Sequence, residues 1–283
     1  MRSEVAAPQT APKSQQQESK WIPGLMISIV VVYIALLLGI PAANVFYQAF
    51  KGGVEPFFDN LIQRDFISAM WLTAVVSVIT VPINTIFGVC AALAIANKRF
   101  RGRTFLLSLI DLPFSISPVV AGLMFVLIFG RQGWLGPVLQ DWNLRVIFAF
   151  PGIALATAFI CIPFVAREVL PVLEEAGIDQ EEAAKTLGAN SWQIFWRVTL
   201  PNIRWGLLYG VILTNARAMG EFGAVAVVSG NIVGRTQTLP LFVEDAYKSY
   251  ATPSAYGAAV VLSLLAVVTL IAKEILERRT RLG

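Results

Sequence analysis

Two oppositely charged residues lie four positions apart inside an apolar stretch of the chain. Arg217 and Glu221 occur in the run NARAMGEFG, within an apolar segment over residues 206–230. Side chains at positions i and i+4 share one face of a helix, so the guanidinium and the carboxylate can pair. Charged groups inside a membrane face a partner or a water-filled cavity. Two interpretations stay open: a neutralised pair that positions helices, or a pair on an anion path in which Arg217 offsets the charge of a dianion.

The same run also contains Gly220 and Gly223, one on each side of the carboxylate. Two small residues at this spacing permit either a close helix contact or a break in the helix. We therefore expect a local irregularity of the backbone beside the charged pair.

Four smaller polar residues lie near the ends of apolar segments. Ser115 and Ser117 accompany prolines that interrupt helical hydrogen bonding, and their hydroxyls could face a cavity or satisfy neighbouring groups. Ser229 and Asn231 follow the segment of the charged pair and could bind oxyanion oxygens or cap a helix. Together with the charged pair, these four residues are our candidates for a translocation path or gate.

Missing residue types exclude several classes of protein. The chain contains no histidine, which excludes histidine-dependent triads and most metal sites. Cys90 and Cys161 both lie in apolar segments and have no metal-binding spacing. No GxxxxGK(S/T) phosphate-binding loop is present. We therefore expect no catalytic residue, no metal and no cofactor bound by this chain, and a membrane enzyme is disfavoured.

Composition indicates an integral membrane protein. Of the 283 residues, 56% are hydrophobic and 14% are charged, and the mean hydropathy is +0.67. A single soluble core could not bury this much apolar surface. The net charge of +4 fits basic loops beside a lipid membrane and does not indicate nucleic-acid binding.

A series of apolar segments predicts an all-α membrane protein with about six transmembrane helices, because about 20 residues cross the hydrocarbon core. The expected spans are residues 22–48, 66–97, 105–129, 146–165, 206–230 and 256–277. Pro82 leaves open whether residues 66–97 form one kinked helix or two parts. Residues 1–20 are expected to be a disordered cytoplasmic arm, and residues 21–283 one polytopic domain.

The positions of lysine and arginine predict that both termini face the cytoplasm. If the spans alternate, the basic residues are enriched in the arm, in residues 98–103, in residues 174–205 and at the C-terminus. Cytoplasmic loops carry such an excess. The loop over residues 174–205, between the fourth and fifth spans, is therefore expected on the cytoplasmic side.

This loop contains the stretch DQEEAAKTLGANSWQIFWRVTLP, residues 179–201, which predicts two short helices. Asp179 with Glu182 fits a capping box at the start of the first helix. Asn190 with Gln193 fits the same pattern at the second.

Glycine and proline are expected to delimit the same two helices. Gly188 fits the turn between them, because glycine adopts the left-handed conformation at little steric cost. Pro201 is expected to end the second helix. The result is a helix-turn-helix elbow that a partner could grip, and an ordinary solvated loop is the alternative.

The elbow is similar to the EAA motif of ABC-importer permeases. The matching residues are Glu182, Ala183, Ala184, Gly188, Val198, Leu200 and Pro201, with Val198 in the place of the usual isoleucine. The resemblance implies a type I ABC-importer transmembrane domain whose cytoplasmic elbow docks into an ATPase subunit. It also implies that these residues couple the chain to that partner.

Two further stretches resemble permeases for oxyanions. These stretches are RAMGEFGAVAVVSGN with the following GRTQTLPL, and DLPFSISPVVAG from residue 111. They are similar to permeases for sulfate, thiosulfate and molybdate, in particular to CysW-type sulfate subunits. The resemblance implies alternating-access import of sulfate or thiosulfate across a bacterial-type inner membrane. Molybdate or tungstate import, and an ion-coupled secondary transporter, are the alternatives.

The resemblance also implies a set of partners. They are a CysT-like permease in a heterodimer, two CysA-like ATPase subunits that use ATP and Mg, and a periplasmic sulfate-binding protein.

Overall fold

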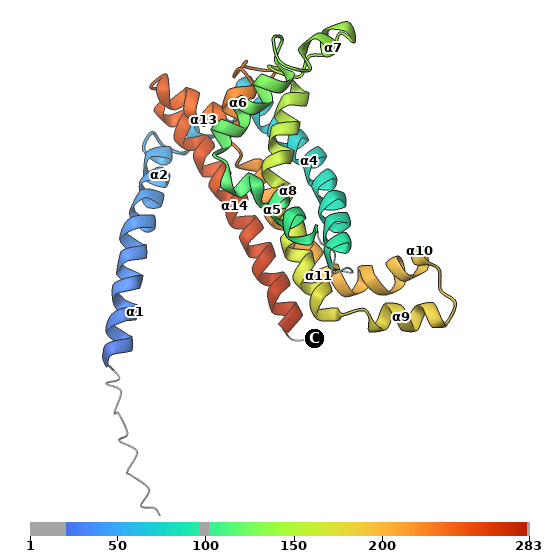
Figure 1. Ribbon diagram of the computed structural model, residues 1–283. Coiled ribbons are helices and arrows are strands. Elements are labelled where there is room, and N and C mark those ends of the chain that lie inside the picture. Colours follow the sequence, from blue (N-terminus) through green and yellow to red (C-terminus); the bar gives the residue numbers. More distant parts are fainter. Residues whose placement is uncertain (1–20, 97–101, 282–283) are drawn as a thin grey trace, which may run out of the picture. The chain divides into compact units, whose positions relative to one another are not determined.

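The computed structural model describes residues 21–96 and 102–281 (Figure 1). In this part of the chain the regular secondary structure is entirely helical. The chain divides into two compact units, residues 1–45 and 46–283. The arm expected over residues 1–20 lies outside the described residues.

The described part of the N-terminal unit is an apolar helix. It consists of α1 (Trp21–Ile34), the π-helical turn η1 (Ala35–Gly39) and the beginning of α2 (Ile40–Phe50), which follow one another without a break. The most apolar 18-residue window of residues 24–50 has a mean hydropathy of 2.6 and is 0% buried. A helix that is apolar on all sides requires lipid or another apolar surface around it. This helix covers the first expected span.

Three long helices form the centre of the larger unit. They are α4 (Arg64–Ala96), α8 (Phe150–Ala176) and α11 (Leu200–Met219), which pack against one another. α4 continues through Pro82, so the second span is one helix and not two parts. The shared core of the three helices comprises Val89, Ala92, Val165, Val169, Leu173 and Ile203.

Shorter helices complete the end of this unit that lies away from the elbow (Figure 1). They are α3 (Val54–Ile62), α7 (Gly136–Asp141) and α13 (Leu239–Lys248), together with the start of the long α14 (Thr252–Arg281). α13 and α14 pack against the start of α4 in a second apolar cluster. Phe66 and Phe242 meet edge to face in this cluster, with ring centroids 5.8 Å apart.

Two of the expected spans are interrupted. Residues 105–129 form α5 (Arg103–Ser115) and α6 (Pro118–Phe129), which are bent by 106° relative to each other. Pro118 explains this break, because a proline disfavours helical geometry in the residue before it, and Ser117 has ψ 134°. Residues 206–230 divide between α11 and the short α12 (Gly223–Val228).

By length and composition alone, the described helices yield fewer candidate spans than the six expected, and the count of six stays a prediction. Within the described residues four helices are long and apolar enough to cross a membrane, or five if the bent pair α5–α6 is one span. α11 does not qualify, because it contains two arginines and two asparagines. The fourth expected span, residues 146–165, corresponds to α8, which begins at Phe150 and continues to Ala176.

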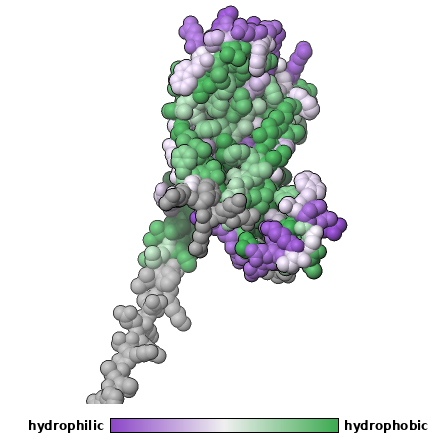
Figure 2. Space-filling model, turned by 45° about the vertical axis from the view of Figure 1, so that its right-hand side comes forward, coloured by the Kyte–Doolittle hydropathy of each residue, from purple (hydrophilic) through white to green (hydrophobic). Residues whose placement is uncertain are grey.

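Apolar and hydrophilic side chains occupy different parts of the surface of the larger unit. Apolar side chains cover its middle, and hydrophilic side chains collect at one end and on the projecting elbow (Figure 2). This pattern is typical of a domain whose middle faces hydrocarbon and whose ends face water.

Glycines set the spacing of the central helices. A Cβ atom added at Gly88 of α4 would lie 2.6 Å from Val165 Cβ and 2.9 Å from the Ala166 nitrogen. A Cβ atom at Gly210 of α11 would lie 3.0 Å from Val165 Cα. An added Cβ atom would therefore clash with α8 at Gly88, and at Gly210 it would be in unusually tight contact with the backbone of Val165.

Replacement of Gly88 by alanine should force α4 and α8 apart. We expect Gly88→Ala to destabilise the folded protein by about 1–3 kcal/mol, the usual range for overpacking. The measurement is the midpoint temperature for loss of helical circular dichroism in detergent. Gly39→Ala is the matched control, because a Cβ atom there meets nothing within 4 Å. Equal midpoints for the two variants would contradict the close-packing argument.

Candidate functional site

The elbow is a pair of short helices that projects from one end of the larger unit (Figure 1). Its first helix is α9 (Asp179–Thr186) and its second begins with α10 (Ser191–Ile194). Gly188 lies between them with φ +87°, so the predicted left-handed turn is confirmed. The predicted capping box at the second helix is also confirmed. Gln193 N donates to Asn190 Oδ1 at 2.8 Å, and Asn190 N donates to Gln193 Oε1 at 2.9 Å.

The predicted cap of the first elbow helix is wrong. The N-cap of α9 is Ile178, and Asp179 is already the first helical residue, without a side-chain capping bond. The backbone N–H of Glu182 donates to the Ile178 carbonyl at 2.9 Å. The acidic residues of this first turn therefore lie beside the positive end of the helix dipole and do not cap it directly.

The prediction that Pro201 ends the second elbow helix is also wrong. α10 passes through the π-helical turn η2 (Phe195–Thr199) directly into α11. In this turn the Leu200 N–H donates to the carbonyl of Phe195, five residues back. A proline lacks an N–H group and collides with the carbonyl four residues before it in a regular helix. The wider turn is a known way to accommodate such a conflict without breaking the helix.

The elbow residues of the EAA motif divide between its surface and its base. Glu182, Ala183, Gly188 and Pro201 are exposed, whereas Ala184 and Leu200 are half-buried. Leu200 packs against the shared core of α4, α8 and α11. The motif thus presents an open surface on the elbow and connects at its far end with the helix core.

Aromatic residues form an additional surface of the elbow. The rings of Trp192 and Trp196 meet edge to face, with centroids 5.5 Å apart, and their exposures are 69% and 49%. Exposed large apolar groups of this kind are typical of a surface that contacts another molecule.

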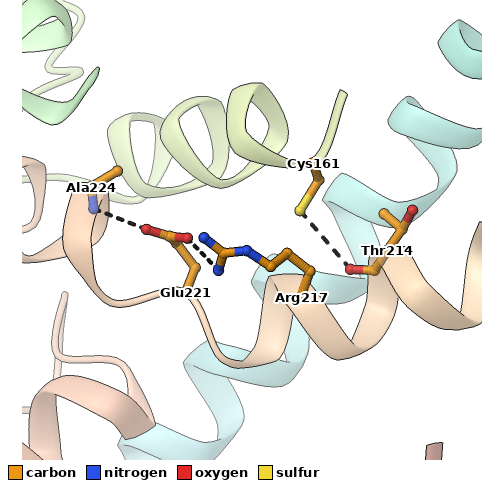
Figure 3. Close-up of polar contacts among 5 residues, drawn as sticks. All are labelled: Cys161, Thr214, Arg217, Glu221 and Ala224. Atoms are coloured by element: carbon orange, nitrogen blue, oxygen red, sulfur yellow. Dashed lines mark hydrogen bonds and ion pairs between the residues drawn. The ribbon is translucent and has the colours of Figure 1, made fainter. Parts of the chain in front are cut away.

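The charged pair forms inside the larger unit, at the junction of α11 and α12 (Figure 3). Arg217 Nη1 lies 2.6 Å from Glu221 Oε2. The Glu221 side chain is 1% exposed and that of Arg217 is 31% exposed. Glu221 Oε1 also accepts a hydrogen bond of 2.9 Å from the Ala224 N–H, at the start of α12. One carboxylate therefore neutralises the arginine and satisfies a backbone donor where the helix is broken.

At the break beside this pair, the start of α12 lies close to the start of α6. α11 ends at Met219, and α12 begins at Gly223. A Cβ atom added at Gly223 would lie 2.8 Å from Pro118 Cβ, at the start of α6. The sequence left open either a helix break or a close helix contact beside these glycines. The structure has both, because the helix breaks after Met219 and Gly223 lies close to Pro118.

The remaining path candidates are distributed over two places. Ser115 and Ser117 are exposed at the bend between α5 and α6. Ser229 and Asn231 follow α12, where the Asn231 N–H donates to Ser229 Oγ at 3.0 Å. Asn231 has a positive φ of 49°, so this serine stabilises a tight turn. The structure therefore joins Ser229 with Asn231, and separately Arg217 with Glu221.

Several polar contacts near the pair had no signal in the sequence. Ser77 of α4 donates to Asn215 Oδ1 of α11 at 2.7 Å, and Cys161 Sγ of α8 lies 3.9 Å from the Thr214 carbonyl. These contacts join residues more than fifty positions apart, which no local pattern specifies. Across the described part of the chain, no group of three or more Cys, Asp or Glu residues could hold a metal ion.

Comparison with known proteins identifies the family. Residues 84–282 match the family described as the binding-protein-dependent transport system inner membrane component. The chain belongs to this family. It is an ABC-transporter permease, which is a non-catalytic subunit.

Two curated relatives of this permease have similar lengths. It is 64% identical over 256 residues to the sulfate transport system permease protein CysW of Synechocystis sp., covering 90% of this chain and 93% of the relative. It is 47% identical to CysW of Escherichia coli over 259 residues, covering 92% of this chain and 89% of the relative.

Solved structures show the same fold at low sequence identity. The permease resembles a chain of a bacterial ABC transporter that imports the acidic polysaccharide alginate, with a TM-score of 0.75 and 18% identity. The match covers 92% of this permease and 95% of that chain. The all-helical fold is therefore that of ABC-importer permeases.

Removal of one member of the charged pair should destabilise the permease. Arg217→Ala leaves a buried carboxylate without its cation, for which about 3–5 kcal/mol is typical. We expect a large loss of folded protein, measured as purification yield and unfolding midpoint in detergent. The double variant Arg217→Ala with Glu221→Gln should recover most of this loss, because the neutral amide still accepts the Ala224 N–H.

The matched control for this experiment is Arg278→Ala. Arg278 pairs with Glu274, also four residues apart, but both side chains are largely exposed. Surface pairs of this kind contribute little, so no measurable change is expected. If Arg217→Ala were as stable as this control, the buried pair would have no structural role.

Proposed function

We propose that this permease is the membrane-spanning subunit of an ATP-driven importer that moves sulfate into the cytoplasm. The observation that carries the proposal is the 64% identity, over 90% of the chain, with a protein named as a sulfate transport permease. Two similar permeases, named CysW and CysT, exist in Escherichia coli, at 47% and 34% identity to this chain. This supports a heterodimer of the chain with a CysT-like subunit.

In this proposal the elbow is the surface that contacts the ATPase. Its support is the exposed position of Glu182, Ala183 and Gly188, beside the exposed rings of Trp192 and Trp196. Leu200 and Pro201 connect this surface to α11. Two CysA-like ATPase subunits bind ATP and Mg, and a periplasmic sulfate-binding protein delivers the anion. Both termini and the elbow then face the cytoplasm.

Transport proceeds by alternating access. Closure of the ATPase subunits on ATP moves the elbow, and the attached helices tilt to open a path toward the binding protein. ATP hydrolysis then returns the path to the cytoplasmic side. A rigid helix can carry such a movement across the membrane, provided that it has two discrete arrangements.

Arg217 is the proposed cation of the anion path. A guanidinium has five N–H donors, and Arg217 is 31% exposed, so it retains donor capacity beyond its contact with Glu221. Glu221 is buried and acts as its fixed counter-ion. Ser115, Ser117, Ser229 and Asn231 are the proposed polar groups along the path or its gates.

Two substitutions in the elbow should separate ATP hydrolysis from transport. Proline cannot adopt the φ of +87° found at Gly188, so Gly188→Pro should distort the turn. Glu182→Lys reverses a charge on the exposed surface. In proteoliposomes that hold the complete complex, we expect sulfate uptake to be lost while ATP hydrolysis and membrane insertion remain.

Glu55→Lys is the control for charge reversal, because Glu55 is an exposed residue of α3. It should transport normally. Unchanged co-purification with the ATPase and unchanged uptake in Gly188→Pro would rule out the elbow as the coupling surface.

The transported anion can be tested with the same proteoliposomes and the cognate binding protein. We expect uptake of radiolabelled sulfate that requires ATP and the binding protein. Uptake of molybdate without uptake of sulfate would instead support the molybdate alternative. Sulfate uptake driven by an ion gradient without ATP would overturn the assignment to an ATP-driven importer.

A further inference from the structure

Thr199 has an unusual hydrogen bond for a threonine in a helix. The hydroxyls of Thr73, Thr80 and Thr214 each donate to the carbonyl four residues back in their own helix. Thr199 Oγ1 instead donates to Glu181 Oε1 at 2.6 Å, across the elbow. The Thr199 residue is 4% exposed, so this bond is shielded from water on one side.

The π-helical turn explains why this hydroxyl points across the elbow. Thr199 is the last residue of η2, and the carbonyl four residues before it, that of Phe195, accepts the N–H of Leu200. The Phe195 carbonyl is thus aligned with residue 200, one position later than in the regular helices that contain Thr73, Thr80 and Thr214. Pro201, which favours the wide turn, therefore also favours the bond from Thr199 to Glu181.

A second bond fixes the first elbow helix at the same level. Asn202 Nδ2 donates to Gln180 Oε1 at 2.8 Å. The two acceptors are neighbours on α9, and the two donors lie at the junction of η2 with α11. Both bonds therefore attach the beginning of α9 to the beginning of α11.

Glycines flank α9 on both sides. Gly177 has φ +65° and Gly188 has φ +87°, and neither would meet an atom within 4 Å if a Cβ were added. Glycines in open space restrict the chain little. Backbone bonds from Gly188 N to the Lys185 carbonyl and from Ala189 N to the Ala184 carbonyl close the turn after α9, and the side-chain bonds to Thr199 and Asn202 add a direct attachment of α9 to the start of α11.

We propose that Glu181 and Thr199 are positioning residues that transmit movement of the elbow to α11. The inference rests on the proposed function. When the ATPase displaces α9, the bond to Thr199 moves the start of α11 with it. Without this bond, only the exposed Asn202–Gln180 bond attaches the start of α9 to α11, and more of the displacement is taken up by turning at the two glycines.

Thr199→Val tests the proposal, because valine matches threonine in shape and lacks the hydroxyl. The measured quantity is the amount of radiolabelled sulfate transported per ATP hydrolysed, in proteoliposomes that hold the complete complex. A hydrogen bond to a charged group is strong enough to shift an equilibrium by about tenfold. We therefore expect this ratio to fall by about tenfold, with unchanged yield of the complex.

Three further variants isolate the bond from packing effects. Thr85→Val is the matched control, because the Thr85 hydroxyl donates to the Val81 carbonyl within α4, outside the elbow. It should keep the wild-type ratio. Thr199→Ser retains the hydroxyl and should restore coupling. Glu181→Ala removes the acceptor from a half-buried surface position and should reproduce the effect of Thr199→Val.

The outcomes separate this inference from the proposed function. If the wild-type complex fails to bind the ATPase or to import sulfate, the proposed function is wrong. If the wild type is coupled and Glu181→Ala also keeps the wild-type ratio, the positioning role is overturned, even if Thr199→Val is impaired. If the double variant Thr199→Val with Glu181→Ala transports as much sulfate per ATP hydrolysed as either single variant, the two residues act through one shared interaction.

Discussion

The close approach of three helices at Val165 is the constraint on which the arrangement of the larger unit depends. α4 and α11 both meet α8 there through glycines, where an added Cβ atom would clash at Gly88 and would make an unusually tight contact at Gly210. In an apolar medium, helices associate mainly through packing, so backbones that approach closely gain the most contact. α8 then leads directly to the elbow, and α11 leads from the elbow to the charged pair. The two functional regions are therefore attached to one rigid contact.

A second constraint acts where the helices are interrupted. Backbone donors freed inside a membrane need partners, since no water is available to them. At the break after α11, the Glu221 carboxylate accepts the Ala224 N–H and pairs with Arg217. The negative charge also lies at the start of α12, where the helix dipole favours it. Because Glu221 both pairs with Arg217 and accepts a backbone N–H, a structural role is favoured for it. Arg217 differs, because it is partly exposed and has donors left over.

Two local features of the elbow were predictable from the sequence, but the equally local Asp179 cap did not form, and the tertiary contacts were not predictable. The Asn190 cap and the Gly188 turn depend on residues within three positions, so the sequence contains the whole signal. The prediction that Pro201 ends a helix was wrong, because a π-helical turn accommodates the proline within a continuous helix. α8 continues to Ala176, past the end of the fourth expected span at residue 165, and therefore includes Arg167. In the structure Arg167 bonds Asp111 at 2.8 Å and lies over the Phe114 ring. The partner of Thr199 could not be predicted, because it lies 18 positions away.

The position of the charged pair relative to the elbow has a mechanical consequence. Thr199 immediately precedes α11, and Arg217 lies in its last turn, so about 27 Å of helix separates them at 1.5 Å per residue. A tilt applied at the elbow displaces the far end of such a helix most. That far end is where the backbone is interrupted at Gly220 and where α12, packed against α6, does not continue the helix. Movement of α11 would therefore first change the geometry between Arg217 and its counter-ion Glu221. A transported anion would compete with Glu221 for Arg217 at this place.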